Sequence, residues 1–405
     1  MTNSREQLIH MLTEAAEIEH NLLCSYLYAV FSLKRAGEPG LTSDQADAVE
    51  RWRKVILSIA LEEMAHLACV NNLLISIGGA PHFDRANFPI APGYHPADVV
   101  VRLTPFDQAT LDHFIFLERP EGSSISDGQG FEASGVDRKV PIEGVTPSAE
   151  DYATVGALYN SIATVFQSLA KRLGEAALFD PTAICQLDTE VVQLPNIFPV
   201  TDLRSALRTI EHIKEEGEGS SGETGDSHFA RFQAIKEEWS ALRNANPDFK
   251  PAWPAAHDPV MRKPSDEKQR VWVTHPLSAA YLDLANASYG AMLSVLSQTF
   301  SLGSADQQRL YMRVSIELME ASAALSAALA RLPSGSVDGV NAGMTFAVPR
   351  NSAFRPLTSR AQSLFLERVL EIEEAAEGLL AGEVAGRVLK RLRNAAGLLD
   401  GKDAG

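Results

Sequence analysis

Apolar residues recur at intervals of three and four along most of the chain, whereas the strict alternation typical of strands is scarce. The pattern predicts helices over roughly 4–36, 44–78, 148–177, 201–217, 227–245, 277–301, 305–332 and 358–398, the last with a break near Gly378 or Gly382. The sequence therefore predicts an all-α fold.

Irregular segments divide this helical pattern. The stretch 79–147 is rich in Gly, Pro and Asp and contains one predicted strand, 99–103; an insertion of this length inside a bundle is typical of a lid or a docking surface. Five prolines mark a second break after residue 245. We therefore divide the chain into a bundle, 1–245, with insertion 79–147; a Pro-rich connection, 246–276; and a C-terminal helical region, 277–405, that packs on the bundle.

Three polar residues interrupt the apolar stripes of the first two predicted helices. Glu19 occupies one position of the first stripe where an apolar residue is expected, and Glu63 and His66 occupy two such positions of the second. Side chains three or four residues apart lie on one face of a helix, so Glu63 and His66 should converge beside Glu19. The other positions of the first stripe are Leu8, Leu12, Ala15, Leu22, Tyr26 and Val30. Those of the second stripe are Trp52, Ile56, Ile59, Val70, Leu74 and Ile77.

Burying these groups without partners costs several kcal/mol, and a divalent cation is one way to compensate several of them together. Helical bundles that bind metals through carboxylates use Glu and Glu-x-x-His in this arrangement. The alternative is that Glu63-x-x-His66 arises by chance and that His66 is an ordinary core histidine. The position of Glu19 in the facing stripe favours the metal site.

Two stretches of the sequence resemble a known family. The first comprises Ala16–His20 and Leu61–Leu67, followed by Ile77–Pro81; the second comprises Ile213–Gly219 and Asp226–Phe232. They are similar to the ferritin-like family that includes iminophenyl-pyruvate dimer synthases, found in violacein and indolocarbazole biosynthesis, and the similarity extends more weakly over most of the chain. The resemblance implies a ferritin-like bundle with a long irregular insertion and additional C-terminal helices.

The resemblance also implies a ligand set. The residues that match the family's motifs are Glu19, Glu63, His66, Glu215 and His228, with Glu218 as a further candidate. His228 opens an apolar stripe and should face inward, and the intervening Ser/Gly loop would allow it to lie beside Glu215. The face that carries Glu215 and Glu218 also fits an ordinary solvated charged surface.

One departure from the family pattern concerns the third helix of the bundle. No Asp, Glu or His occurs between Asp151 and Glu175, and Ala157 stands where an acid is expected. Two cations close together need several anionic bridges to offset their repulsion. We therefore expect one firmly bound ion, with Glu218 or Tyr159 as the residues that would fill the gap. The implied metal is iron, as one or two ions, although another divalent metal would also suit these ligands.

Composition restricts the partners. A net charge of -16 disfavours nucleic acid and anionic lipid, and no stretch approaches the roughly 18 apolar residues of a membrane span. Three widely spaced cysteines and an N-terminus without a signal-peptide pattern suggest a cytoplasmic protein. The apolar C-terminal helices would pack against the bundle or against a second subunit of a homo-oligomer.

Two functions remain open from the sequence. The first is a metal-dependent oxidoreductase or imine-coupling enzyme of secondary metabolism, with a small amino-acid-derived substrate. The second is a non-enzymatic metal-binding or scaffold protein whose metal supplies folding energy. A pocket beside the metal would favour the enzyme, and a sealed shell of apolar side chains would favour the scaffold.

Overall fold

The computed structural model describes residues 4–96, 99–131, 133, 135, 136, 138, 144–149, 151–180, 185–219, 226–265, 270–350 and 360–401. Its helices are α1 (Arg5–Ser32), α2 (Ser43–Ser76), α3 (Gln108–Leu117), α4 (Val155–Leu173), α5 (Glu175–Leu178), α6 (Leu203–Gly217), α7 (His228–Ala245), α8 (Pro276–Thr299), α9 (Ala305–Leu329), α10 (Ala361–Leu379) and α11 (Gly382–Leu399). Two short strands, β1 (Pro259–Val260) and β2 (Val271–Trp272), pair in parallel. The predicted all-α class is confirmed.

Local sequence signals explain where the bundle helices begin and end. The side chain of Ser4 accepts a hydrogen bond from the backbone of Gln7 at the start of α1, and Thr42 and Gln45 form a reciprocal capping box at the start of α2. After α2 the backbone reverses at Gly78, whose φ of 84° is accessible to glycine at little cost. These boundaries fix the lengths of the two long helices that carry the polar residues.

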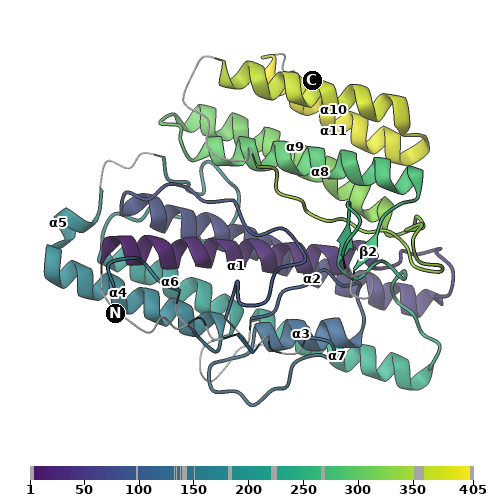
Figure 1. Ribbon diagram of the computed structural model, residues 1–405, viewed down its shortest axis with the longest axis horizontal. Helices are drawn as coiled ribbons and strands as arrows, with labels where there is room; N and C mark the ends of the chain where they lie inside the picture. Colours follow the sequence, from purple (N-terminus) through teal and green to yellow (C-terminus); the bar gives the residue numbers. More distant parts are fainter. Residues whose placement is uncertain are drawn as a thin grey trace.

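The long antiparallel pair α1 and α2 forms the centre of the molecule. Helix α4 packs on α1 and α6, and α7 packs on α2 and α3. On the other side α9 contacts α1, and α8 and α9 lie between the central pair and α10 and α11; these four helices form a two-tiered outer layer (Figure 1). Buried apolar side chains from Leu8 to Leu399 form one continuous cluster, so this outer layer shares its core with the bundle. The division at residues 246–276 stays a prediction.

The insertion differs from the sequence-based expectation in two respects. Residues 99–103 form no strand; Leu103 instead exchanges backbone and side-chain hydrogen bonds with Asp258. Helix α3, which was not predicted, begins where Asp107 accepts a hydrogen bond from Thr110, and buries Leu111 and Phe114. Its short length and the Gly-rich surroundings concealed it in the sequence pattern. Part of the insertion, including residues 139–143, lies outside the described ranges.

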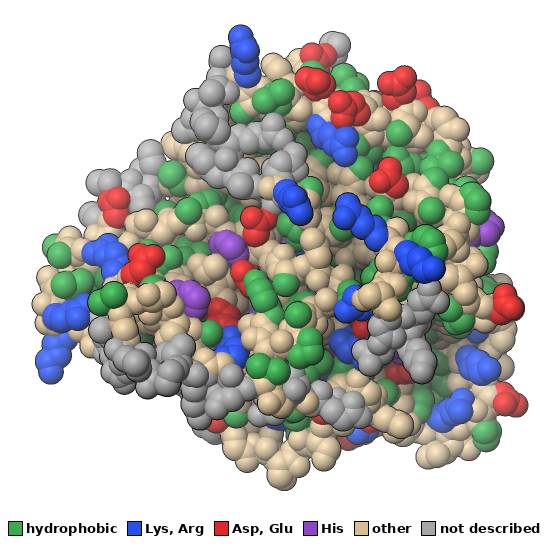
Figure 2. Space-filling view, in the orientation of Figure 1, with side chains coloured by type: hydrophobic (Ala, Val, Ile, Leu, Met, Phe, Trp, Pro, Cys, Tyr) green, Lys and Arg blue, Asp and Glu red, His purple; other side chains and the backbone are tan. Residues whose placement is uncertain are grey.

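No helix in the described part of the chain combines the length and apolar character needed to cross a bilayer. On the face drawn in Figure 2, acidic and basic side chains are interspersed rather than gathered by sign. The described side chains on that face therefore form no continuous basic surface of the kind that follows a phosphate backbone.

Candidate metal centre

The polar residues of α1 and α2 meet inside the bundle, as their spacing predicts. Glu19, Glu63 and His66 are each 2% exposed, and one ligand atom from each lies within 4.8 Å of the other two. The Nδ1 atom of His66 is 3.3 Å from Oε2 of Glu63 and 3.6 Å from Oε2 of Glu19. These three residues form the first ligand group.

A second ligand group lies directly beside the first and shares Glu63 with it. It consists of Glu63, Glu118 and His228, again with ligand atoms within 4.8 Å of one another. The Nδ1 atom of His228 is 2.8 Å from Oε1 of Glu63 and 3.6 Å from Oε1 of Glu118. Glu63 therefore turns one carboxylate oxygen toward each histidine, which is the arrangement of a carboxylate that bridges two positions.

The outer nitrogen of each histidine contacts a carboxylate. Nε2 of His66 lies 2.9 Å from Glu216, and Nε2 of His228 lies 3.0 Å from Glu62. In the neutral imidazole, a carboxylate at Nε2 selects the tautomer with the proton on Nε2, so the Nδ1 lone pair faces inward. Nδ1 of His228 is buried and makes no hydrogen bond in the described structure, which is consistent with a ligand position.

Two phenols complete the walls of the cluster. Tyr159 of α4 donates a hydrogen bond to Glu19, and Tyr26 of α1 donates one to Glu118. Both tyrosines are at most 1% exposed. Helix α4 thus contributes a phenol at the level of the cluster, where the sequence shows no acid, and the insertion contributes the carboxylate of Glu118 from the end of α3.

The electrostatics of the cluster reflect the crowding of its acids. Burial, together with the neighbouring Glu63, raises the pKa of Glu19 to about 8. Burial alone would raise the pKa of Glu63, but His228 and His66 outweigh it and hold that pKa well below its usual value. The pKa values of both histidines are raised, because the adjacent carboxylates outweigh the effect of burial. Without a cation the cluster therefore retains protons that a metal would displace.

The donor set fits one or two divalent metal ions. Three carboxylates and two imidazoles are typical ligands of iron and similar transition metals, and their burial without a cation leaves closely spaced acids that compete for protons. The residues present are therefore compatible with the metal that the sequence resemblance implies.

The residues expected from the sequence are not all in the cluster. The structure brings together Glu19, Glu63, His66 and His228. Glu215 is exposed, and Glu218 accepts a hydrogen bond from the backbone of Gly156 at the start of α4, so neither belongs to the two groups. His228 approaches Glu63 and Glu118, and not Glu215.

Sequence reasoning did not find Glu118, Glu62 or Glu216. Glu118 follows an unpredicted helix in the insertion, and only its position directly after the apolar run Phe114–Leu117 gave a signal. Glu62 and Glu216 each adjoin a residue that the sequence did single out, Glu63 and Glu215. On a helix such neighbours point about 100° apart, which is why they contact the outer side of the histidines.

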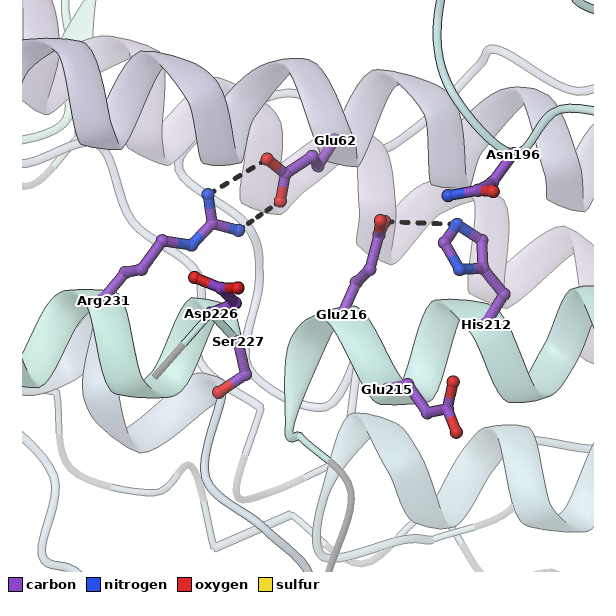
Figure 3. Close-up of a pocket in the computed structure, with 8 residues that line it drawn as sticks. All are labelled: Glu62, Asn196, His212, Glu215, Glu216, Asp226, Ser227 and Arg231. Atoms are coloured by element: carbon purple, nitrogen blue, oxygen red, sulfur yellow. Dashed lines mark hydrogen bonds and ion pairs between the residues drawn. The ribbon is translucent and has the colours of Figure 1, made fainter. Parts of the chain in front are cut away.

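An open pocket of about 460 Å³ lies against this outer side. Its walls include Glu216 and Glu62, the residues that contact His66 and His228, and Figure 3 shows Arg231 paired with Glu62 across it. Hydrogen bonds from His228 and Arg231 outweigh the burial of Glu62 and lower its pKa to about 2. The remaining described lining residues are Asn196, His212, Glu215, Asp226 and Ser227.

The stability of the metal-free protein should fall as pH rises from 6 to 9. In the folded protein Glu19 must ionise near pH 8 instead of near 4.5, which costs free energy over this interval. The raised pKa values of His66 and His228 act in the same direction, since their stabilisation is complete below about pH 6.5 and is lost as pH rises through the folded-state values.

Thermal unfolding of chelator-treated protein at several pH values measures this effect. Metal-loaded protein is the control, because bound metal already holds the ligands deprotonated and its melting temperature should fall less. Equal pH slopes with and without metal would show that these groups do not titrate as their surroundings indicate.

Comparisons with known proteins agree with the helical-bundle fold. The family model described as ferritin-like matches residues 12–237. The chain is 27% identical over 418 residues to a dichlorochromopyrrolate synthase of Lentzea aerocolonigenes, covering 92% of this chain and 39% of that protein. It is 29% identical over 366 residues to a 2-imino-3-(indol-3-yl)propanoate dimerase of Chromobacterium violaceum, covering 84% and 34%. The chain thus spans between a third and two fifths of the length of these curated relatives.

Among solved structures, a ferritin-like protein from Caulobacter vibrioides aligns with 74% of this chain and 88% of its own, at 18% identity and a TM-score of 0.47.

Proposed function

Because the chain belongs to the ferritin-like family, we propose that it is a metal-dependent enzyme acting on a small imine derived from an amino acid. The observation that carries the proposal is the pair of buried ligand groups that share Glu63, next to an open pocket. Perturbed titratable groups beside a pocket are the usual mark of an active site.

We propose two metal positions in place of the single ion expected from the sequence. Glu19, Glu63 and His66 would hold one ion, and Glu63, Glu118 and His228 would hold the second. The single-ion expectation rested on the missing acid of the third helix, and Glu118 supplies a carboxylate from a different element. When bound, iron would supply the change between oxidation states that couples reduction of dioxygen or a peroxide to oxidation of the substrate.

The protein's own residues would perform the remaining tasks. Glu62 and Glu216 would orient the two histidines through their Nε2 atoms. Tyr26 would orient the carboxylate of Glu118, and Tyr159 that of Glu19. The pocket would admit the substrate on the side of Glu62 and Glu216, while the apolar core around α1 and α2 keeps bulk water from the ligand groups. A lid function of the insertion stays a prediction.

The substrate class is proposed from the relatives. One is named for the dimerisation of an indolyl imino acid and the other for the synthesis of dichlorochromopyrrolate. An imine-coupling or related oxidative activity on an amino-acid-derived substrate is therefore the activity we propose for this chain, within secondary metabolism. Since the chain spans only part of both relatives, their exact substrates are not assigned to it.

The alternative is a protein that binds metal for structure alone. A structural metal site is usually closed and shielded by apolar side chains. The open polar pocket beside the outer partners of both histidines supports the enzyme over this alternative.

The activity can be tested with the imine named for one relative. Protein loaded anaerobically with ferrous iron is mixed with 2-imino-3-(indol-3-yl)propanoate and then with dioxygen or hydrogen peroxide. We expect consumption of the oxidant together with a coupled or oxidised product, detected by mass spectrometry. Metal-free protein and a Glu63→Gln variant are the controls. Stable metal binding without turnover of this or other amino-acid-derived imines would favour the structural alternative.

A further inference from the structure

A second buried polar cluster lies on α1, away from the metal centre. Its members on α1 are His20, Asn21 and Cys24, which share a face of the helix that is turned away from Glu19. Segment 82–95 of the insertion covers this face with Arg85 and His95, and α8 contributes Tyr289. Each of these six residues is at most 6% exposed.

Arg85 is the only formal charge in this cluster. Its guanidinium lies over the ring of Phe88, 4.6 Å from the ring centroid. The guanidinium donates hydrogen bonds to the backbone oxygens of Ala86 at 2.9 Å and Phe346 at 2.6 Å, and to Tyr289 at 3.2 Å and Cys24 at 3.6 Å. These partners are uncharged, and no carboxylate of the described residues lies within ion-pair distance of Arg85.

The neighbouring side chains do not provide a negative charge. Burial raises the pKa of the Cys24 thiol and of the Tyr289 phenol, so both remain protonated despite the proximity of Arg85. Glu17, the acid on the same side of α1, is already engaged by His82 at 3.1 Å and Tyr94 at 2.5 Å. A buried cation without a counter-charge is costly, and the fold must offset that cost in another way.

The hydrogen-bond inventory shows which groups lack partners. Nε of Arg85 is buried without an acceptor, and an arginine N–H can only donate. Tyr289 has one hydroxyl proton; because it accepts from Arg85, that proton is available to Nε2 of His20.

The pair Asn21 and His95 extends this inventory. The amide nitrogen of Asn21 is 2.9 Å from Nε2 of His95, and when the amide donates, the histidine proton lies on Nδ1. That Nδ1 atom is also buried without a partner. Burial lowers the pKa of His95 to about 4, so this histidine is neutral at physiological pH. Oδ1 of Asn21, an acceptor, is also buried without a partner, so this pair lacks one partner of each kind. The orphaned donor on the guanidinium itself is Nε of Arg85.

We propose that a small monovalent anion of halide size binds against Nε of Arg85, between α1, segment 82–95 and α8. The anion supplies both the missing charge and the missing acceptor. A cation is excluded by the charge of Arg85, and a water molecule would satisfy the donor without offsetting the charge. The bound anion would join the insertion and the C-terminal layer to α1, independently of the metal centre.

Bromide is a suitable probe because it can be located by anomalous X-ray scattering. In crystals of the full chain grown with sodium bromide, we expect an anomalous peak within hydrogen-bond distance of Nε of Arg85. In solution, replacing gluconate by bromide at constant ionic strength should raise the melting temperature by about 2 °C or more, and the rise should saturate. Water at this position without anomalous signal would overturn the proposal.

Two variants separate this site from general salt effects. Arg85→Met should abolish the saturable rise, whereas Arg331→Met, which removes a partly buried arginine paired with Glu38, should retain it. A saturable rise of equal size in Arg85→Met would refute the assignment. If Arg85→Met does not fold, Arg85→Lys is the alternative variant. It retains the charge but lacks Nε, so the rise in melting temperature with bromide should be smaller. The crystallographic test on the unaltered chain needs neither variant.

Discussion

Glu63→Gln is expected to remove most of the bound metal from both positions. Glu63 offers Oε1 toward His228 and Oε2 toward His66, so the neutral amide would weaken both ligand groups at once. Removing a residue that only hydrogen-bonds to a metal ligand typically lowers metal affinity 10–100-fold. Replacing Glu63, a ligand shared by both groups, should lower the affinity at each position by at least about as much. Metal analysis of protein purified without chelator measures the change, and the activity should fall with the metal content.

The matched control is Glu17→Gln, a half-buried carboxylate of α1 that contacts His82 and Tyr94 and lies outside both groups. This variant should keep the metal content of the unaltered protein. A Glu63→Gln protein that also kept its metal would place the metal site elsewhere in the chain.

Glu118→Gln is expected to halve the number of ferrous ions bound per chain. The unaltered chain should bind two ions in an anaerobic titration, because Glu63 belongs to both candidate ligand groups. Without the charge of Glu118 the position at His228 loses one of its two carboxylates, whereas Glu19, Glu63 and His66 remain. Mössbauer spectra of the oxidised protein should change from a coupled pair to an isolated ion.

Two further variants serve as controls for this stoichiometry. Glu215→Gln and Glu218→Gln should bind as many ions as the unaltered chain, since neither carboxylate enters the cluster. A single ion per chain in the unaltered protein would instead support the expectation drawn from the missing acid of α4. Loss of an ion in either control would return Glu215 or Glu218 to the ligand set.

The sequence determined the long helices and the central residues of the candidate metal site because both depend on short-range periodicity. Apolar spacing placed α1 and α2 to within a few residues, and their starts coincide with the capping residues Ser4 and Thr42. Glu19, Glu63 and His66 stood out because a polar group in an apolar stripe must face the core once the helix packs. His228 was found by the same argument, from the stripe that it opens.

The tertiary structure decided which other groups reach the centre. The sequence shows that α6 is helical and carries neighbouring glutamates near its end, but the rotation of α6 against α2 determines that Glu216, and not Glu215, meets His66. Glu118 lies 55 residues after Glu63 in the chain. It reaches the candidate metal centre only because α3 packs on α7. No local pattern encodes such an approach, because it depends on the path of the insertion.

Arg85 shows the same limit outside the metal centre. In the sequence it is one charged residue in an irregular segment, where a solvent-exposed position is the default expectation. Only the packing of segment 82–95 between α1 and α8 buries its charge beside Tyr289 and Cys24. Periodicity along a helix is a local property that the sequence specifies, whereas contacts between distant segments depend on how all of the elements pack together.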